Sequence, residues 1–515
     1  MLGKRDPQRR LFATSTLLGD DQLDRMGFHG RLARESHRIF RDEDFSALYC
    51  ADNGRPSVPP SVLALATLLQ FHDNISDFEV TERCRYDLRW KAALHLDTHS
   101  IECPFAKSTF QAFRLRLTLH EKEGFLFEQS VKAAAKAGLL PRRMRVAVDS
   151  TPVRGRGAVK DTFNLLSEAI RKIVRRVAGA LEKDATELAD ERGLGRHLTA
   201  ASIKGSTFVD WQDKEDVDRF LASLLVDARR AIELASETNC AIEEVGLLRG
   251  VMDQDIDPEG PNGGPVIRRG VAKERSPSVS DPEMRHGRKS SGSTYNGHKA
   301  HLSVEVESRI ITSVDVTAPS EPEGGKLGEM LDQTEQNTGS KVEVAYGDSA
   351  YGTARAVEQA DDRDVKLTTK MPRHDRSRFG PGDFEVSEDG RHAVCPAGVS
   401  SARVQKLGQG HLLMWDAAAC GRCPLRDRCT RAKKGRQLRV GPEFHDRRRR
   451  EAYAWSEEGR ADLRDRVIVE HAIGRMKARG ARRARYFGRR KTRYQLLMTA
   501  TVVNFSLLWG QKAAG

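Results

Sequence analysis

The chain has 515 residues, 38% of them hydrophobic, so it is long enough for several domains and can bury at least one large core. Its formal net charge of +13 indicates a polyanionic partner, either nucleic acid or an acidic membrane surface. A spanning helix is disfavoured because no stretch approaches the roughly 18 to 20 uninterrupted apolar residues that it needs. The N-terminal MLGKRDPQRRLF lacks the apolar core of a signal peptide, so we expect a cytoplasmic protein without a membrane partner.

The first part of the chain is expected to be a flexible basic arm, residues 1–40, followed by a helical domain, residues 41–138. The arm is polar and basic with little periodicity. In the helical domain, Pro59 and Pro60 stand where a helix would begin, and apolar residues follow at helical spacing. Basic helix faces suit the phosphates and the major groove of DNA, but they are also common in packing domains, so both interpretations stay open.

The rest of the chain, residues 139–510, is expected to form an α/β domain. Strand-like runs occur in MRVAVD, KAHLSVEVES, RIITSVDVT and KVEVAYGD, and the second and third of these have the pattern of an antiparallel hairpin. Three segments interrupt this pattern. They are a helical insertion at 160–250, a flexible linker rich in Gly, Pro and Ser at 253–294, and a cysteine-containing insertion at 373–445.

Two of the strand-like runs end in an aspartate, Asp149 in VAVDSTP and Asp348 in VAYGDSAYG. If the two strands are neighbours, both carboxylates lie at one edge of a sheet. Such a pair suits a divalent metal site for phosphoryl transfer, because Mg²⁺ binds hard oxygen ligands, usually through few carboxylates. Aspartates that follow strands are also frequent as turn residues, so the pair alone does not decide between these interpretations.

A third acidic candidate, Glu470, lies in the helical segment RDRVIVEHAIGRMKARG. Arg466 is one helical turn before it and Lys477 two turns after it, so the three side chains share approximately one face. A carboxylate flanked by cations on one face suits a group that meets both a metal and a phosphate backbone. The ordinary alternative is a solvated helix with an i,i+4 ion pair.

Taken together, the contexts of Asp149, Asp348 and Glu470 resemble bacterial insertion-sequence DDE transposases with an RNase H-like catalytic core. In one large branch, the third carboxylate lies in a signature of Tyr, two residues, Arg, three residues, Glu, six residues and Lys. The chain matches this spacing at Arg466, Glu470 and Lys477 but has Leu463 in place of the tyrosine, which leaves any role of that tyrosine open. The order of the segments is also similar to that family over roughly residues 40 to 510.

The resemblance implies a fold and a reaction. The fold would be a mixed sheet flanked by helices, preceded by an all-α domain. Two Mg²⁺ or Mn²⁺ ions held by the three carboxylates would support hydrolysis at each transposon end and attack of the freed 3′-hydroxyl on target DNA. The partners would be the terminal inverted repeats and the target DNA, on which the protein would act as a dimer. The protein would lie in a bacterial cytoplasm, associated with the nucleoid.

Basic residues near the third carboxylate are candidates for contact with DNA phosphates. Arg466 and Lys477 lie nearest to the expected cut, and Lys299 begins a strand that should neighbour Asp149. The run around RRARYFGRRKTRY continues the positive charge with Arg482, Arg483 and Arg485. The alternative for each of them is an ordinary solvated surface cation.

Four of the eight cysteines crowd into one segment: Cys395, Cys420, Cys423 and Cys429. In a reducing cytosol they are thiols or metal ligands. Four thiolates can form a closed tetrahedral zinc site, which would be structural because it leaves no open position for catalysis. The spacing is irregular for a zinc ribbon, so zinc and free thiols both stay open.

Three other functions compete with transposition. One is a zinc-dependent structural or scaffolding protein, which predicts that chelation abolishes folding while mutation of the carboxylates leaves function unchanged. A nuclease with an RNase H-like core that cuts without joining would carry the same carboxylates. A domesticated DNA-binding protein that has lost catalysis would not need them, and the occupation of all three acidic positions argues against it.

Overall fold

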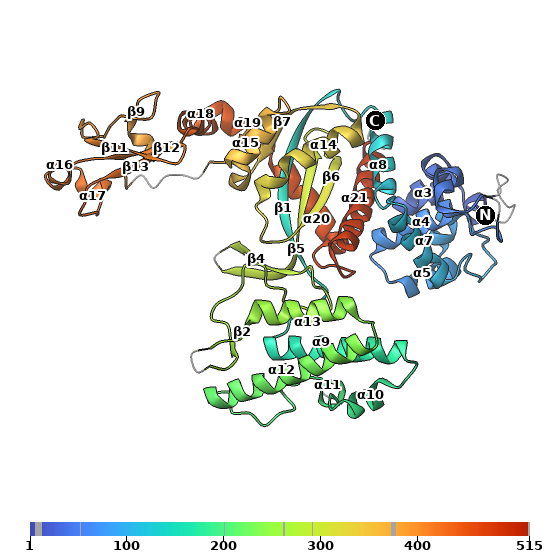
Figure 1. Ribbon diagram of the computed structural model, residues 1–515. Coiled ribbons are helices and arrows are strands. Elements are labelled where there is room, and N and C mark those ends of the chain that lie inside the picture. Colours follow the sequence, from blue (N-terminus) through green and yellow to red (C-terminus); the bar gives the residue numbers. More distant parts are fainter. Residues whose placement is uncertain are drawn as a thin grey trace.

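The computed structural model describes residues 1–5, 13–51, 53–199, 201–260, 263–290, 292–371 and 377–512. It is a mixed α/β structure in which a central sheet domain joins three other parts: a helical N-terminal domain, a helical insertion and a small β unit (Figure 1). Within the described residues, every helix is too short or too polar to cross a membrane.

The central sheet has six strands: β1 (Arg143–Arg154), β4 (Arg285–Ser290), β5 (Ser293–Glu305), β6 (Ile311–Thr317), β7 (Lys341–Gly347) and β8 (Lys366–Thr369). β1 pairs antiparallel with β5 on one side and parallel with β7 on the other. β5 also pairs antiparallel with β6, which confirms the predicted hairpin, and β7 pairs parallel with β8. The sheet is therefore mixed. β1, which carries Asp149 and continues to Arg154, is the neighbour of β7, which ends one residue before Asp348.

Alternating residues of β1 face two different hydrophobic cores, as the period of two in a strand requires. Met144, Val146 and Val148 pack with helices α14 (Leu327–Thr338) and α15 (Ala354–Asp361). Ala147 and Val153 belong to the core that also contains helices α20 (Val467–Met476) and α21 (Arg489–Lys512). Helices thus cover both faces of the sheet, which explains why these strands are apolar along most of their length.

The N-terminal domain contains the short helices α1 (Thr14–Leu17) and α2 (Asp20–Arg25), then α3 (Phe28–Ile39), η1 (Asp42–Leu48), α4 (Pro60–Asp73), α5 (Asp77–Tyr86), α6 (Leu88–Leu94), α7 (Lys107–Leu119) and α8 (Phe125–Lys136). α4 is buried along most of its length. It shares one core with α8, α20 and α21, so the N-terminal domain packs directly on the central domain.

The expected flexible arm at residues 1–40 is corrected for residues 14–39, which contain three helices. In α3 the buried positions are His29, Gly30, Leu32, Ala33 and Ser36. Apolar residues do recur at helical spacing here, at Phe28, Leu32 and Ile39, but charged and polar residues outnumber them, which gives the segment the composition of a polar arm. Residues 6–12 of the expected arm lie outside the described part of the chain.

The helical insertion contains α9 (Thr162–Ala180), α10 (Ala185–Glu191), α11 (Arg196–Thr199), α12 (Lys214–Glu237) and α13 (Ile242–Asp255). These helices bury a hydrophobic core of their own, separate from the core of the sheet. The insertion is therefore a distinct packing unit, and Figure 1 shows it on the side of the sheet domain where β4 lies.

The expected flexible linker at 253–294 is corrected where the structure describes it. Its last part forms β4, an edge strand that pairs with β5, and two short strands precede it, β2 (Ile256–Asp257) and β3 (Val266–Ile267). Asp255 accepts hydrogen bonds of 2.6 and 2.7 Å from Arg275, and Thr162 donates another to it. The polar residues that suggested a linker are thus partners in ion pairs and strand hydrogen bonds.

The small β unit follows the central sheet. It consists of η4 (Pro381–Asp383), β9 (Glu385–Val386), β10 (Ala393–Val394), β11 (Arg403–Leu407), β12 (Gly410–Met414), α16 (Ala417–Gly421), α17 (Arg426–Cys429) and β13 (Gln437–Val440). Its buried hydrophobic core has six residues: Phe384, Ala393, Leu413, Trp415, Leu438 and Val440. Helices α18 (Phe444–Trp455) and α19 (Glu457–Asp462) lead from this unit, which projects to one side in Figure 1, back to α20.

Candidate functional site

Asp149 and Asp348 lie side by side just beyond the paired stretch of two parallel strands. Ala147 of β1 is paired with Tyr346 of β7, and each aspartate comes two residues after its paired residue. Asp149 is still part of β1, whereas Asp348 follows β7 and caps the short helix η3 (Ser349–Tyr351) by accepting a hydrogen bond from the backbone N–H of Ala350. The two carboxylates therefore leave neighbouring strands at the same level.

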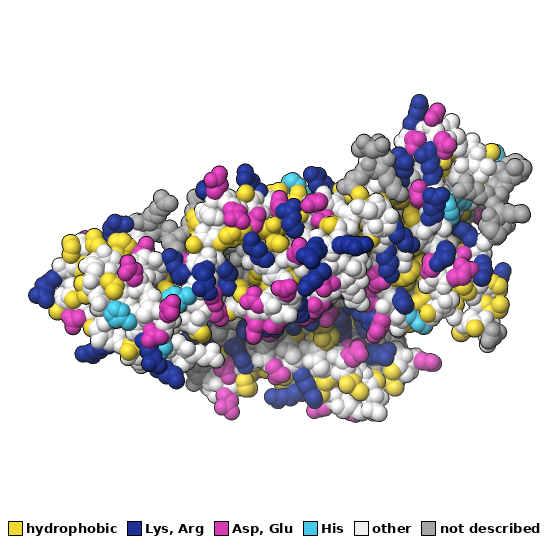
Figure 2. All heavy atoms as spheres, turned by 90° about the horizontal axis from the view of Figure 1, so that it is seen from above, with side chains coloured by type: hydrophobic (Ala, Val, Ile, Leu, Met, Phe, Trp, Pro, Cys, Tyr) yellow, Lys and Arg dark blue, Asp and Glu magenta, His cyan; other side chains and the backbone are white. Residues whose placement is uncertain are grey.

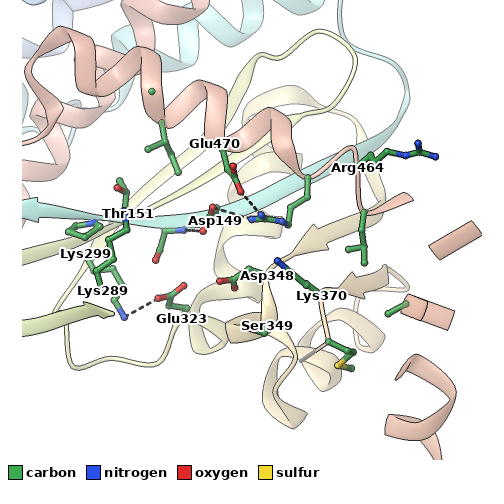
Figure 3. Close-up of a pocket in the computed structure, with 18 of the residues that line it drawn as sticks. Asp149, Thr151, Lys289, Lys299, Glu323, Asp348, Ser349, Lys370, Arg464 and Glu470 are labelled. Atoms are coloured by element: carbon green, nitrogen blue, oxygen red, sulfur yellow. Dashed lines mark hydrogen bonds and ion pairs between the residues drawn. The ribbon is translucent and has the colours of Figure 1, made fainter. Parts of the chain in front are cut away.

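The third carboxylate beside them is Glu323, which begins the short helix η2 (Glu323–Lys326). One ligand oxygen from each of Asp149, Glu323 and Asp348 lies within 4.8 Å of the others, and Figure 3 shows the three side chains directed toward one another. Glu323 is not among the residues predicted from the sequence. It lies in the polar loop SEPEGGK, where an acidic residue at a helix start is ordinary, and no spacing links it to the strands.

Glu470 lies on α20, on the opposite side of Asp149 from Glu323 (Figure 3). Arg466 connects Asp149 with Glu470, because its guanidinium lies 3.4 Å from Asp149 Oδ2 and also donates a hydrogen bond to Glu470 Oε1. The Glu470 side chain is 47% exposed, whereas that of Arg466 is 17% exposed. The predicted triad thus lines one cavity of about 1170 Å³, with Arg466 between two of its members.

The electrostatic environment of Asp149 is that of a crowded, half-buried carboxylate. Burial, together with the charges of Asp348 and Glu323, raises the pKa of Asp149 to about 6, although the Ser150 N–H and Arg466 act in the opposite direction. The same three carboxylates add to burial in raising the pKa of Tyr351. A divalent cation would relieve this repulsion, and the hard oxygen donors fit Mg²⁺ or Mn²⁺.

Lys477 and Lys299 also line the cavity. Burial and the neighbouring Lys289 and Arg482 lower the pKa of Lys477, so cations gather around it. Lys299 Nζ donates a hydrogen bond of 2.8 Å to the carbonyl of Glu321 and lies 3.5 Å from Glu323 Oε1. Lys299 is therefore engaged with the acidic loop.

Five further cations line the cavity that no sequence motif indicated. They are defined here as the basic rim: Arg288, Lys289, Lys370, Arg460 and Arg464. All five are exposed, and they come from β4, from the end of β8 and from the segment around α19. Elsewhere basic and acidic side chains intermingle, as on the face in Figure 2, so the local rim is more informative than the net charge.

The predicted DNA-binding arginines after α20 divide into two groups. Arg482 and Arg483 are exposed, and the backbone of this segment pairs with Arg154 at the end of β1. Arg485 instead reaches the N-terminal domain, where it donates to Asn74 Oδ1 at 3.2 Å and lies over the ring of Phe71. Arg485 therefore joins two domains, a role that the charge pattern did not reveal.

The four clustered cysteines are half-buried in the small β unit. Burial raises the pKa of Cys429, and Cys395, Cys420 and Cys423 are near enough to contribute to this shift. Among the described residues, the two groups with all ligand atoms within 4.8 Å are the carboxylates above and His29, His72 and Asp73. The thiols are thus neighbours, but no three of the four sulfur atoms lie within 4.8 Å of one another.

Two family models match the chain. A model described as a transposase DDE domain matches residues 394–509, and one described as a transposase domain (DUF772) matches residues 23–116. No curated protein and no solved structure gives a significant match. The first matched range contains Glu470 but neither aspartate, so the placement of Asp149 and Asp348 rests on the strand geometry.

Proposed function

This chain belongs to the insertion-sequence DDE transposases, and from that premise we propose that its carboxylate cavity cleaves transposon ends and joins the freed 3′-hydroxyls to target DNA. The observation that supports this most directly is the placement of Asp149 and Asp348 at one level of two paired parallel strands, with Glu470 across Arg466. Carboxylates that converge in this way are what metal-dependent phosphoryl transfer requires.

We infer an RNase H-like core for the central domain. The support is the sheet, in which β6, β5 and β1 pair antiparallel and then β1, β7 and β8 pair parallel, with helices on both faces. This order places β1 in the centre of the sheet and Asp149 next to Asp348, which follows β7.

Asp149, Asp348 and Glu470 would hold two Mg²⁺ or Mn²⁺ ions, and their oxygen donors fit such ions. When bound, the ions would supply Lewis-acid activation of the attacking oxygen and charge stabilisation of the leaving oxygen. The protein's own groups would then bind and orient the DNA strand, since phosphoryl transfer depends mainly on positioning and electrostatics.

DNA phosphates would be held by cations inside the cavity and at its edge. Arg466 and Lys477 line the cavity on the α20 side, and Arg482 lies close to Lys477. We propose phosphate contacts for these three, for Arg483 and for the basic rim, with Lys299 orienting the acidic loop. Arg485 is assigned to the domain contact rather than to DNA.

Transposon ends would be recognised with help from the N-terminal helical domain, which packs on α21 beside the central domain. Because two ends must be held together, we propose that two copies act as a dimer on DNA, in the bacterial cytoplasm and at the nucleoid. The alternatives, a nuclease that cannot join and a domesticated protein that only binds DNA, make different predictions for the experiment below.

The experiment uses the full chain with the element's own end sequences and Mg²⁺. Wild type is compared with Asp149→Asn, Asp348→Asn and Glu470→Gln, and with Glu343→Gln as a control, since Glu343 lies on β7 but pairs with Arg143 away from the cavity. We expect the three variants to bind DNA yet lose cleavage and joining by at least about 10³-fold, and the control to stay active.

The same assay separates the alternatives. A wild type that cuts ends but never joins precut 3′-ends would be a nuclease. A wild type that binds ends and neither cuts nor joins would be a DNA-binding protein. Activity that survives in Asp149→Asn or Asp348→Asn would show that the catalytic carboxylates lie elsewhere.

We also propose that the small β unit binds one structural zinc ion through Cys395, Cys420, Cys423 and Cys429. The support is twofold. First, the four thiols are neighbours. Second, a core of only six buried hydrophobic residues is small for an independent unit, so a bound metal ion would supply stability that hydrophobic burial does not.

A further inference from the structure

The loop that carries Glu323 is held firmly against the catalytic edge of the sheet. Lys299 on β5 donates to the carbonyl of Glu321, and the next turn packs so closely that a Cβ on Gly324 would lie 2.6 Å from Thr353 Oγ1 and 3.1 Å from Ala356 Cβ. Thr353 caps α15, just after η3 and Asp348. Glu323 is therefore fixed beside Asp348 by backbone packing.

The two glutamates of this loop have different surroundings. Glu321 accepts a hydrogen bond from the backbone N–H of Ala318 and pairs with Arg489 at 3.3 Å, so it stabilises the loop and the start of α21. Glu323 begins a helix that has no side-chain cap hydrogen bond, and its carboxylate is directed toward Asp149 and Asp348. Loop hydrogen bonds therefore account for the position of Glu321, whereas Glu323 lies between Lys299, at 3.5 Å, and the two aspartates.

The negative charge around Glu323 exceeds the cations that face it. Asp149, Glu323 and Asp348 share a region in which one ligand oxygen of each lies within 4.8 Å of the others. Lys299 lies 3.5 Å from Glu323, and Arg466 faces Asp149 from the opposite side. Three carboxylates with two monovalent cations at this spacing favour a divalent cation.

We propose that Glu323 is a fourth carboxylate ligand of the metal centre, which with Asp149 and Asp348 binds one divalent ion, while Asp149 and Glu470 bind the other. Asp149 would be shared, since it lies between Glu323 on one side and Glu470 on the other (Figure 3). This inference rests on the proposed function, to which it adds a ligand outside the three-carboxylate signature.

The test measures metal binding directly, on the full chain without DNA. Mn²⁺ binding is followed by titration calorimetry for wild type, Glu323→Gln and the matched control Glu321→Gln. We expect Glu323→Gln to weaken the tighter Mn²⁺ site by at least about tenfold, as loss of a ligand carboxylate should, and Glu321→Gln to bind as wild type. Glu323→Asp, which keeps the charge on a shorter side chain, should recover part of the affinity.

Thermal unfolding provides the folding control. Without metal, Glu323→Gln should unfold at or above the wild-type temperature because it removes one of three repelling charges, and added Mn²⁺ should stabilise it less than wild type. The inference would be overturned if Glu323→Gln bound Mn²⁺ as tightly as wild type while Asp348→Asn lost Mn²⁺ affinity.

The outcomes for the ligand and for the proposed function are separable. If wild type fails to cleave or join DNA but Mn²⁺ binding depends on Glu323, the fourth ligand stands and transposition fails. If DNA is cut and joined but the Mn²⁺ affinity is the same with and without the Glu323 carboxylate, transposition stands and the fourth ligand is excluded.

Discussion

The guanidinium of Arg466 lies 3.4 Å from Asp149 Oδ2, although the two residues are 317 positions apart in the chain. The same guanidinium donates to Glu470. Arg466 therefore supplies the positive charge between two carboxylates that would otherwise repel each other.

Replacement of Arg466 by Met should destabilise the metal-free protein. Asp149 is half-buried, and a buried charge left without its partner costs about 1–3 kcal/mol. Differential scanning calorimetry should show a lower melting temperature without metal, and Mg²⁺ should restore more stability in this variant than in wild type. Arg464→Met, at an exposed rim position, is the control and should melt as wild type; equal melting of both variants would contradict the bridging role.

The basic rim should contribute to DNA affinity without regard to sequence. Lys289→Gln and Lys370→Gln should each weaken binding of end DNA and random DNA alike, and each should reduce the salt dependence of log K by about 1. Fluorescence anisotropy over a series of salt concentrations gives both quantities. Lys183→Gln, a cation of the helical insertion paired with Glu191, should leave the slope unchanged. If the dependence of log K on salt concentration were unchanged in both rim variants, DNA would not contact this part of the cavity.

Acid should destabilise the fold partly through His301, a fully buried residue of β5 that hydrogen-bonds with Thr317. Burial lowers the pKa of His301 to about 4 from 6.5, with Lys299 and Lys326 acting in the same direction and Asp315 opposing them. Because the unfolded chain takes up this proton first, His301 costs stability as pH falls from about 6.5 to 4, by roughly 3 kcal/mol in total.

Urea unfolding across this pH range, for wild type and His301→Gln, isolates the contribution of His301. Acidic groups that titrate in both proteins cancel in the difference. The variant should lose less stability than wild type between pH 6.5 and 4, whatever its stability at neutral pH. Parallel curves would show that the pKa of His301 is the same in the folded and the unfolded chain.

Zinc should be present at one equivalent per chain if the four-cysteine proposal holds. The Cys423→Ser variant should lose the zinc ion. The Cys240→Ser variant should keep it, because Cys240 lies in the helical insertion. Chelation should then speed proteolysis within residues 377–443 more than elsewhere, because the six-residue core remains alone. Metal analysis that finds no zinc in wild type, with proteolysis unaffected by the chelator, would leave the four residues as free thiols.

The site was predictable where a local pattern carries it. Asp149 and Asp348 follow apolar, strand-like runs, and Arg466, Glu470 and Lys477 have a fixed spacing along one helical segment, so short stretches of sequence suffice to single them out. Their convergence depends on the pairing of β1 with β7, which no local pattern gives.

Other features could not be predicted because their partners are distant in sequence. Glu323 is distinguished by its approach to two strand ends, and its own loop looks ordinary. Arg485 has the composition of a DNA contact and instead meets Asn74 across a domain boundary. In α3, His29 and Ser36 occupy inward positions where only tertiary contacts mark them as buried.

The helical insertion leaves and rejoins the sheet at almost one point. Arg154 at the end of β1 and Arg285 at the start of β4 are both paired with Gly297, on opposite sides of β5, which places them roughly 10 Å apart, two strand spacings. Because β1 and β4 run parallel with β5 between them, a crossover of about a dozen residues over β5 could join these ends without shifting the register of any strand. Residues 155–284 are thus a cassette, which evolution or an engineer can lengthen, exchange or delete while the catalytic edge keeps its alignment.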